Sequence, residues 1–411
     1  MKKILILCAD FPPSPSAGAQ RPYAWYKYLS ENGVYPIIFC HEHDGEKIVE
    51  DLDLGRIIYC RKQRLGFFNG NNKLSLGLRK IETLIKNIFQ FISFRFDEHQ
   101  SIYHDARTFL QRENVDLIVS TGGPQILYRH AALLSREFSI KWIADYRDLW
   151  TFYPKHSSNV VKEFFHKMKH RYFELKYLKT ASAITCVTSA LKSELSKVFN
   201  IPIYTIRNGF IKSDQYISPV NIEDNKIKIA YLGTVYDYYN FRGFNEGLRL
   251  FSELNPNIDV EIHFFGIKER KNQRRVVERN IVSKKVNLFF YASIPNDSLY
   301  NHLGTFELLL AFGISDGPFI SVKLFDYLQL KRQILLFAKN NPIQSEIVEK
   351  TNSGQALGDR NALSNFLNNY VQKRRVLGYD YPQQINLNKY NRKYQTKEFS
   401  NILVRIINES Q

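Results

Sequence analysis

The stretch FELLLAFGISDGPFISVKLFDYLQLKRQILLF, residues 306–337, decides the fold that the sequence predicts. It contains two short apolar runs, 306–312 and 333–337, and glycines flank the first of them, which is typical of buried strands. Between the runs lie a Gly-Pro loop and a short helical segment around Lys323. This order of strand, loop, helix and strand predicts a parallel sheet, in which anionic ligands bind where a strand ends and a helix begins.

Lys323 and Asp326 stand three residues apart in this segment. Because residues three apart share one face of a helix, both side chains are expected near the end of the strand. We expect Lys323 to hold a phosphate and Asp326 to hold a sugar hydroxyl. A surface salt bridge between the two side chains is the alternative interpretation.

Strands and helices alternate along the rest of the chain as well. The other predicted strands are short apolar runs at residues 3–8, 35–39, 115–120, 140–145, 183–187, 203–206, 227–232, 260–265 and 286–291. This alternation predicts two doubly wound α/β domains with parallel sheets. The polar segment 211–224 is the expected linker. The domains are therefore placed at 1–210 and 211–388, and a last helix at 389–411.

Composition limits the classes of function. At 411 residues the chain is too long for one core, and its 44% hydrophobic and 24% charged residues match a globular protein. The four cysteines are scattered, as expected of core thiols in a reducing compartment. There is no apolar run of 18 residues and no cluster with metal-ligand spacing. The net charge of +17 predicts an anionic partner, and no nucleic-acid-binding motif accompanies it.

Small and charged residues follow several of the predicted strands. Thr121, Gly122 and Gly123 form a tight turn after the strand at 115–120, and its amides could face an anion. In "DYRDLW", residues 145–150, three charges crowd into four positions, which favours a functional site over a structural ion pair. Similar strand ends occur at Arg207-Asn208-Gly209 and Gly233-Thr234, and Arg242 opens the helix after the second of these.

These segments together resemble a known family. Gly18, "STGGP", "DYRDLW", "ITCVTSALKSEL", "IRNGF", "AYLGTVYDYYNFRGF", "HFFG" and "SVKLFDYLQLKRQILL" occur in the order seen in GT-B glycosyltransferases. The similarity is closest to glycosyltransferase family 4, in the branch that carries an Arg-Asp-x-Trp segment and builds bacterial surface polysaccharides. The resemblance implies two Rossmann-like domains that face each other across a cleft. It also implies that the C-terminal helix crosses back to the first domain.

On the donor side, the resemblance implies that the C-terminal domain binds a nucleotide sugar, with a UDP-sugar expected. Arg242 matches a phosphate-binding lysine, and Lys323 replaces an arginine for which this chain has Gly233-Thr234. Asp326 matches the second glutamate of a Glu-(seven residues)-Glu pattern that contacts the ribose, while Pro318 stands at the first position. The remaining donor-binding residues implied by the match are Phe265, Gly266, Tyr291, Ile294 and Ser321.

On the acceptor side, the resemblance places a group of residues along the cleft. These residues are Gly18, Thr121, Gly122, Gly123 and Asn208. Asp148, with its neighbour Arg147, is the expected catalytic group and would act as the base near the reacting hydroxyl. The implied transfer proceeds with retention, needs no metal, and uses no cofactor besides the nucleotide-sugar co-substrate.

Two stretches of the N-terminal part mix basic and aromatic residues. They cover residues 56–95 and 155–179, and their apolar residues recur at roughly helical spacing. This pattern is typical of helices that lie in an anionic membrane interface, although an ordinary core-facing helix with a basic solvent face shares it. Membrane binding would present a polyprenyl-diphosphate-linked acceptor to the cleft.

We therefore predict a cytoplasmic glycosyltransferase, peripheral at the inner face of the cell membrane, that acts on a glycan or lipid-linked glycan. One alternative is a GT-B sugar-nucleotide 2-epimerase, which needs no acceptor. The other is a non-catalytic protein that binds sugar nucleotides or polysaccharide, which Thr234 and Pro318 make credible because they replace functional residues of the family.

Overall fold

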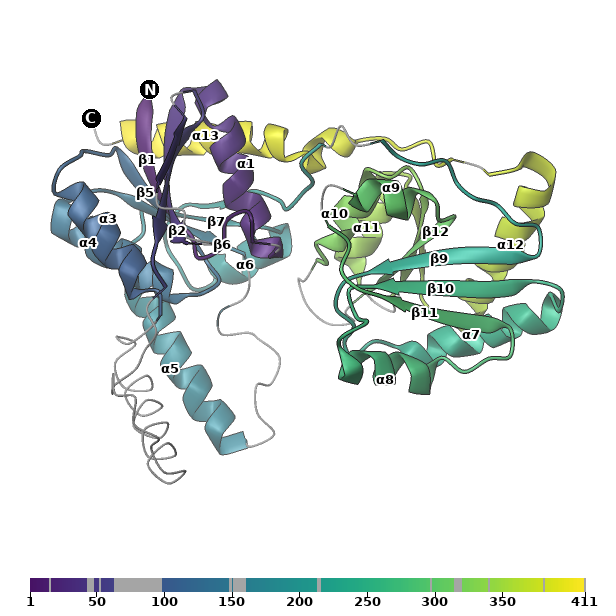
Figure 1. Cartoon of the computed structure of the whole chain (residues 1–411). Helices are drawn as coiled ribbons and strands as arrows, with labels where there is room; N and C mark the ends of the chain where they lie inside the picture. Colours follow the sequence, from purple (N-terminus) through teal and green to yellow (C-terminus); the bar gives the residue numbers. More distant parts are fainter. Residues whose placement is uncertain are drawn as a thin grey trace, which may run out of the picture. The chain divides into compact units, whose positions relative to one another are not determined.

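A computed structural model gives the structure of the protein (Figure 1). It describes residues 1–14, 16–42, 48–51, 53–62, 98–147, 150, 160–212, 216–295, 298–313, 320–338, 341–379 and 381–409. The chain divides into two compact units. Unit 1 consists of Met1–Arg207 with Arg392–Gln411, and unit 2 is Asn208–Asn391. Both units are α/β, as the alternation of apolar runs predicts.

Unit 1 is built on an eight-stranded sheet with the order β3-β4-β2-β1-β5-β6-β7-β8. Neighbouring strands run parallel except β3 and β4, which are antiparallel. The strands are β1 (Lys2–Leu7), β2 (Val34–His41), β3 (Ile48–Asp51), β4 (Gly55–Cys60), β5 (Leu117–Thr121), β6 (Trp142–Tyr146), β7 (Ala183–Cys186) and β8 (Ile203–Thr205). In the central strand β1, Ile4 to Leu7 are fully buried, as expected of a parallel sheet covered on both faces.

The helices of unit 1 come from both ends of the chain. They are α1 (Gln20–Tyr28), α3 (Gln100–Leu110), α4 (Ile126–Phe138), α5 (Val160–Leu178), α6 (Ser189–Ser196) and α13 (Arg392–Asn408), with 3-10 turns η1 (Ala17–Ala19) and η2 (Ser30–Asn32). Helix α13 crosses α1 (Figure 1). The ring of Phe399 stacks on that of Trp25, with the two centroids 4.7 Å apart. Leu403 and Ile406 join the same core. This packing confirms that the last helix returns to the first domain.

Unit 2 is built on a six-stranded, entirely parallel sheet with the order β11-β10-β9-β12-β13-β14. Its strands are β9 (Lys226–Leu232), β10 (Asp259–Phe265), β11 (Val286–Tyr291), β12 (Leu308–Phe312), β13 (Gln333–Phe337) and β14 (Gly354–Leu357). Strands β12 and β13 both come from the stretch 306–337, and they pair side by side.

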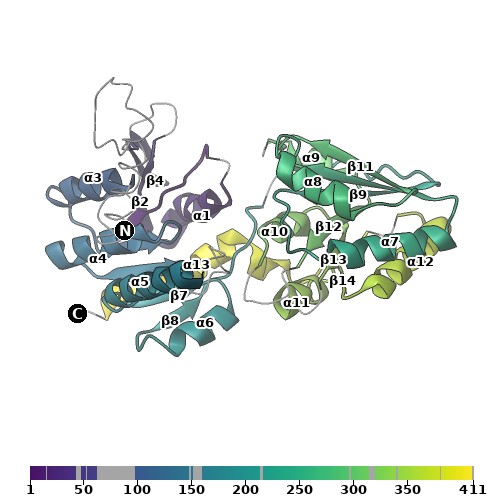
Figure 2. The same cartoon turned by 90° about the horizontal axis from the view of Figure 1, so that it is seen from below.

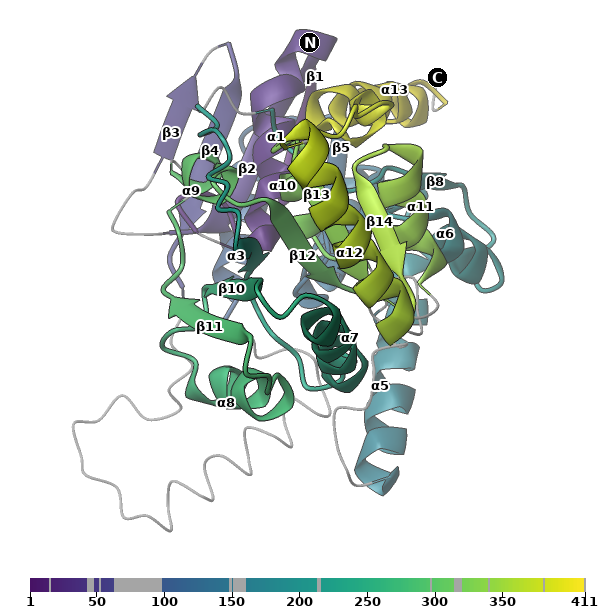
Figure 3. The same ribbon diagram turned by 90° about the vertical axis from the view of Figure 1, so that its right-hand side faces the viewer.

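Helices cover both faces of this second sheet. They are α7 (Phe241–Leu254), α8 (Lys271–Asn280), α9 (Leu299–Gly304), α10 (Lys323–Leu328), α11 (Pro342–Lys350) and α12 (Arg360–Leu377), with a 3-10 turn η3 (Leu387–Tyr390). Helices α7, α8 and α12 share one core with the sheet, and α9, α10 and α11 share the other. Helix α7 lies against α12 (Figure 2), and α11 lies beside β14 (Figure 3). Gly247 in α7 allows this close packing, because an added Cβ would lie 2.9 Å from the carbonyl oxygen of Arg360 and 2.9 Å from the Cβ of Leu363, both in α12.

Two features of unit 2 differ from the sequence-based prediction. The edge strand β14 was not predicted, because Gly354-Gln-Ala-Leu has low strand propensity and pairs only through its neighbour β13. The expected linker 211–224 is, in its described residues, part of unit 2. There, Ile217 packs on the core and the carbonyl of Ser218 accepts a 2.7 Å hydrogen bond from buried Arg332. Polar residues suit this segment because they bind polar groups of unit 2, as Ser218 does with Asn301 and Arg332.

The four cysteines are buried and carry free thiols; they are Cys8, Cys40, Cys60 and Cys186. Within the described ranges, no helix is both long enough and apolar enough to span a bilayer.

Unit 1 contains a cluster of buried histidines. His41 Nε2 lies 2.5 Å from His99 Nδ1, and His130 on α4 packs its ring against Tyr103. Burial lowers the pKa of His130 to about 3 and that of His41 to about 4, and the charges of neighbouring histidines act in the same direction. Neither ring nitrogen of His130 has a hydrogen-bond partner among the described residues.

We expect this cluster to make the protein acid-sensitive. The pKa of His130 is lower in the folded state than its value of about 6.5 in the unfolded state, so protons bind the unfolded chain more strongly. The free energy of unfolding is therefore highest above pH 6.5 and decreases as the pH falls below that value. Urea unfolding at pH 7 and pH 5 should show a loss of about 2 kcal/mol from His130 alone, and His130→Leu should remove that part of the loss. Exposed His302 is the matched control, and an equal effect of His302→Leu would contradict the assignment to His130.

Candidate functional site

In unit 2, two glycine turns lie side by side at the carboxyl ends of β9 and β10. Gly233 follows β9 with φ of 85°, and Gly266 follows β10 with φ of 92°, a left-handed conformation that favours glycine. The N–H of Gly233 donates a 2.8 Å hydrogen bond to the carbonyl of Phe265. The two turns therefore pack closely against each other. Because neither glycine has a side chain, the side chain of Lys323 can approach Gly233.

Lys323 enters this region from the first position of α10. Its Nζ lies 3.5 Å from the carbonyl oxygen of Thr234 and 3.8 Å from the centroid of the Tyr231 ring. Among the described residues, no carboxylate forms an ion pair with this ammonium group. Burial lowers the pKa of Lys323 to about 7, so the cation is held at a cost that a bound anion would offset.

Arg270 reaches the same turn from the loop after β10. Its Nη1 donates a 2.7 Å hydrogen bond to the hydroxyl of Thr234. Two cations therefore flank Thr234, one at its backbone and one at its side chain. A hollow of about 360 Å³ at the start of α8 is lined by Arg270 and its chain neighbours Glu269, Lys271, Asn272 and Gln273.

Arg270 was not among the residues predicted from the sequence. It stands in the basic run "KERKNQRR", which follows the glycine turn at Gly266, so the rule that ligands bind at strand ends could have selected that run. The rule could not have chosen among its basic residues.

Arg242 is the second residue of α7, the helix that follows the Gly233-Thr234 turn. Its side chain is 89% exposed, and its Nε pairs with Glu246 Oε1 at 3.1 Å. Glu246 also pairs with Arg360 at 3.3 Å. The structure places no contact between Arg242 and either Lys323 or Thr234.

Asp326 and Ser321 flank Lys323 in the chain. Asp326 is partly exposed in the first turn of α10, and its charge contributes, after burial, to the raised pKa of Tyr300. Asp326 and Lys323 do not pair with each other, so the salt-bridge alternative is not what the structure shows. The N–H of Ser321 donates to Gln344 Oε1 at 3.3 Å. Pro318 lies outside the described residues.

The residues expected to frame a nucleotide base come together. The Phe265 and Tyr291 rings stack with centroids 4.8 Å apart, and Gly266 donates its N–H to the carbonyl of Tyr291 at 3.0 Å. Ile294 packs on the core that contains Phe265. Tyr291 is 38% exposed, so this aromatic edge is open to a ligand.

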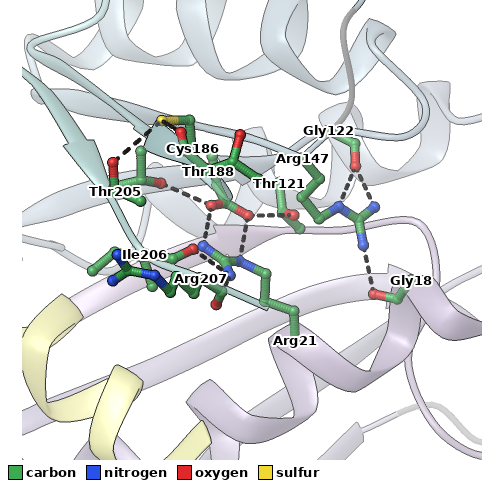
Figure 4. Close-up of polar contacts among 12 residues, drawn as sticks. Gly18, Arg21, Thr121, Gly122, Arg147, Cys186, Thr188, Thr205, Ile206 and Arg207 are labelled. Atoms are coloured by element: carbon green, nitrogen blue, oxygen red, sulfur yellow. Dashed lines mark hydrogen bonds and ion pairs between the residues drawn. The ribbon is translucent and has the colours of Figure 1, made fainter. Parts of the chain in front are cut away.

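In unit 1, Asp145 of "DYRDLW" is the centre of a buried charge network. Its carboxylate accepts two hydrogen bonds from Arg21, at 2.7 and 2.9 Å, and one each from Thr121 and Thr185, at 2.8 Å. Arg21 also donates to the carbonyls of Ile206 and Arg207, both at 3.0 Å. Both charges are almost wholly buried, so Asp145 serves the fold as a structural ion pair (Figure 4).

Arg147 ties together the loops that the sequence analysis assigned to the acceptor. Its guanidinium donates to the carbonyl of Gly122, with Nε at 2.7 Å, and to that of Gly18 at 2.8 Å (Figure 4). Its Nη2 also donates to the carbonyl of Gly122, and a longer bond of 3.4 Å reaches the carbonyl of Gly123. Arg147 therefore positions these loops through the carbonyls that it binds.

The other residues predicted for the acceptor side do not all belong to one unit. Thr121 is buried and bound to Asp145, and Asp148 lies outside the described residues. Asn208 is the first residue of unit 2, whereas Gly18, Thr121, Gly122 and Gly123 belong to unit 1.

The end of "DYRDLW" is anchored to α5. The N–H of Trp150 donates to the hydroxyl of Tyr146 at 2.8 Å, and Tyr146 in turn hydrogen-bonds the buried carboxylate of Glu174. The indole of Trp150 donates to His170 Nδ1 at 2.6 Å. Residues on both sides of Asp148 are thus fixed by side-chain bonds. In the described part of the chain, no three His, Cys, Asp or Glu side chains are placed to hold a metal ion.

Comparisons with known proteins identify the fold. No family model and no curated protein sequence matches this chain. Among solved structures, sucrose-phosphate synthase from Thermosynechococcus elongatus is similar with a TM-score of 0.62 and 14% identity, covering 100% of this chain and 97% of that one. The lipopolysaccharide outer core galactosyltransferase WaaB gives 0.56 and 14%, covering 98% and 99%. A candidate UDP-N-acetylglucosamine 2-epimerase from Listeria monocytogenes gives 0.51 and 11%, covering 100% and 98%.

These likenesses extend over nearly the whole chain, so the protein has the GT-B fold of glycosyltransferases, as its ordered sequence segments predict.

Proposed function

We propose that the protein is a glycosyltransferase that moves a sugar from a UDP-sugar donor to a glycan or lipid-linked glycan acceptor. The observation that carries this proposal is the convergence of Lys323 and Arg270 on Thr234, next to two glycine turns at the carboxyl edge of a parallel sheet. In the part of the chain that the structure describes, neither cation is paired with a carboxylate. Two such cations suit a diphosphate, because each charge-assisted bond stabilises a phosphate oxygen. The GT-B fold favours a nucleotide sugar as the source of that diphosphate.

The proposed reaction breaks the bond between the anomeric carbon of the sugar and the diphosphate oxygen, and the acceptor hydroxyl forms the new bond. Negative charge grows on the leaving diphosphate, where Lys323 and Arg270 would stabilise it as fixed donors. We propose retention at the anomeric carbon and no metal requirement. The stacked Phe265 and Tyr291 would border the base, and Asp326 would accept a bond from the ribose.

The acceptor would be bound by unit 1. Arg147 holds the loops at Gly18 and Gly122, which gives an acceptor a fixed surface. Asp148 is our candidate for the base that takes the acceptor proton. A role in bacterial cell-surface polysaccharide synthesis follows from the ordered sequence segments, and the fold likeness to WaaB is in keeping with it.

Incubation with a panel of UDP-sugars tests this function. A donor at 100 times its dissociation constant should stabilise the protein by about 2.7 kcal/mol in a thermal-shift assay, and a suitable acceptor should then give a glycosylated product.

Asp148→Asn should lower turnover roughly 10²- to 10⁴-fold with nearly unchanged donor binding, because it removes only the base. A fully active Asp148→Asn protein would exclude that role, and the absence of any nucleotide-sugar binding would exclude the proposed function.

A sugar-nucleotide 2-epimerase is the second candidate. The likeness to the Listeria protein favours it, because that fold is shared over the full chain. An epimerase would convert the donor to a second UDP-sugar without any acceptor, so product analysis in the absence of acceptor separates the two functions. A non-catalytic sugar-nucleotide binder would bind UDP-sugars and yield no product in either assay.

We also propose that unit 1 binds the inner face of an anionic membrane through α5. Met168 and Tyr172 stand four residues apart on this helix and are 55% and 59% exposed, among basic residues that include Arg171 and Lys176. Such a mixture of apolar and basic side chains suits an interface of anionic lipids. Residues 63–95 of the first basic stretch lie outside the described residues, and Arg56 is paired with Glu113.

Liposome co-sedimentation checks the membrane proposal. The protein should sediment with anionic vesicles at about 0.1 M salt and be released at roughly 1 M, because salt screens the attraction. Binding should fall in Met168→Ser/Tyr172→Ser, while Tyr394→Ser, an exposed tyrosine on α13, should have no effect. Equal binding to neutral vesicles would contradict an electrostatic attachment.

A further inference from the structure

Two exposed tyrosines form a stacked pair in the loop between β9 and α7 of unit 2. The Tyr236 and Tyr238 rings lie 5.0 Å apart with an interplanar angle of 12°. They are 43% and 51% exposed, although aromatic rings of this size usually bury most of their surface. Asp237, between them in the chain, is also exposed.

The pair rests on a rigid base. Tyr239 is buried and meets both rings edge-on, at 5.6 Å from Tyr236 and 5.3 Å from Tyr238. Its own ring stacks on Phe312 of β12 at 5.0 Å. The exposed rings are therefore supported by the aromatic core of the unit, which fixes their orientation before any ligand binds.

The position of the pair indicates its ligand. Tyr236 follows Thr234 by two residues, so it lies within about 7 Å of the turn that Lys323 and Arg270 flank, measured along the backbone. A pyranose ring has an apolar face of C–H groups and a rim of hydroxyls. An exposed aromatic face with a nearby carboxylate offers partners for both.

We propose that Tyr236, Asp237 and Tyr238 form a subsite that binds a pyranose ring by stacking. This inference rests on the proposed function, which supplies a sugar next to the diphosphate-binding cations. The ring could belong to the donor or to a separate glycan, and the chemistry of recognition is the same. A nucleobase would be a different ligand, and its binding would contradict the proposal.

Isothermal titration with UDP and with a panel of UDP-glucose, UDP-galactose and UDP-N-acetylglucosamine tests the donor. In Tyr236→Ala/Tyr238→Ala, the affinity for the preferred UDP-sugar should fall roughly three- to tenfold while that for UDP stays unchanged. Tyr236→Phe/Tyr238→Phe keeps both rings and should behave as the wild type. Tyr216→Ala, at a 71% exposed tyrosine of the same unit, is the surface control.

Saturation-transfer NMR with lactose tests a separate glycan. A lactose signal that the double alanine variant loses, with UDP-sugar affinity unchanged, would assign the subsite to a glycan and support the proposal. Unchanged behaviour of that variant towards both the UDP-sugars and lactose would overturn it, and so would an equal loss of affinity for UDP. If the wild-type protein binds neither UDP nor any UDP-sugar, the proposed function fails, and the lactose experiment still decides on the subsite.

Discussion

Asp145→Asn should lower the free energy of unfolding of unit 1 by about 3–5 kcal/mol, the usual cost of removing one partner from a buried ion pair. The expected loss is large because Arg21 would keep its charge with only 2% of its side chain exposed. The asparagine also turns one acceptor into a donor, and this donor would face Arg21 or a threonine hydroxyl. Urea unfolding followed by circular dichroism measures the change.

An exposed ion pair of the same unit provides the control. Arg107 binds Glu137 through Nε at 2.8 Å and is 43% exposed, so solvent screens the pair. Arg107→Gln should therefore cost less than about 1 kcal/mol. If Asp145→Asn were no more destabilising than Arg107→Gln, the buried network would not have the structural role that we assign to it.

Lys323→Met should weaken UDP binding about 10- to 100-fold near neutral pH, because a hydrogen bond to a charged group is worth roughly 1.5–3 kcal/mol. The wild-type affinity should also depend on pH. Since burial holds the pKa of Lys323 at about 7, much of this side chain is neutral above that pH and must take up a proton when the diphosphate binds. UDP affinity should therefore fall as the pH rises from 7 to 9.

Calorimetry measures this coupling directly. Titrations of UDP at pH 8 in two buffers with different ionisation enthalpies should show the uptake of nearly one proton by the wild type and of none by Lys323→Met. Lys331→Met, at a lysine exposed after α10, is the matched control and should retain the uptake. Equal UDP affinity of Lys323→Met and the wild type at pH 7 would remove Lys323 from the site.

The sequence predicted the five strands β9 to β13 of the second sheet well, because each is a short run rich in apolar residues. Val286–Tyr291 and Gln333–Phe337 are apolar runs whose bounds agree with the structure. Strands β3 and β14 were missed because each has only four residues, and β4 was missed because it begins with Gly55 and Arg56. All three depend on pairing with neighbouring strands. A local pattern contains no information about such pairing.

The residues of the candidate site that follow a strand were predicted from the sequence, whereas those that reach the site from elsewhere in the chain were not. The rule that ligands bind at strand ends led to Lys323 and to the turn at Gly233-Thr234, which are in fact neighbours. It did not lead to Arg270, which meets Thr234 from 36 residues away in the chain, or to the partner of Asp145, which is 124 residues away. Contacts of this kind depend on the tertiary fold, so crowded charges in "DYRDLW" were interpreted as functional although Asp145 is structural.

The return of α13 to unit 1 has a consequence for biosynthesis. The ribosome completes the whole of unit 2 before it makes Phe399, Leu403 and Ile406, which the core of unit 1 contains. Until then, the stacking surface of Trp25 has no Phe399 to cover it. Unit 2 can therefore fold during translation as one continuous stretch of chain, whereas the core of unit 1 stays incomplete until α13 is made. The apolar surface that waits for α13 is of the kind that favours aggregation.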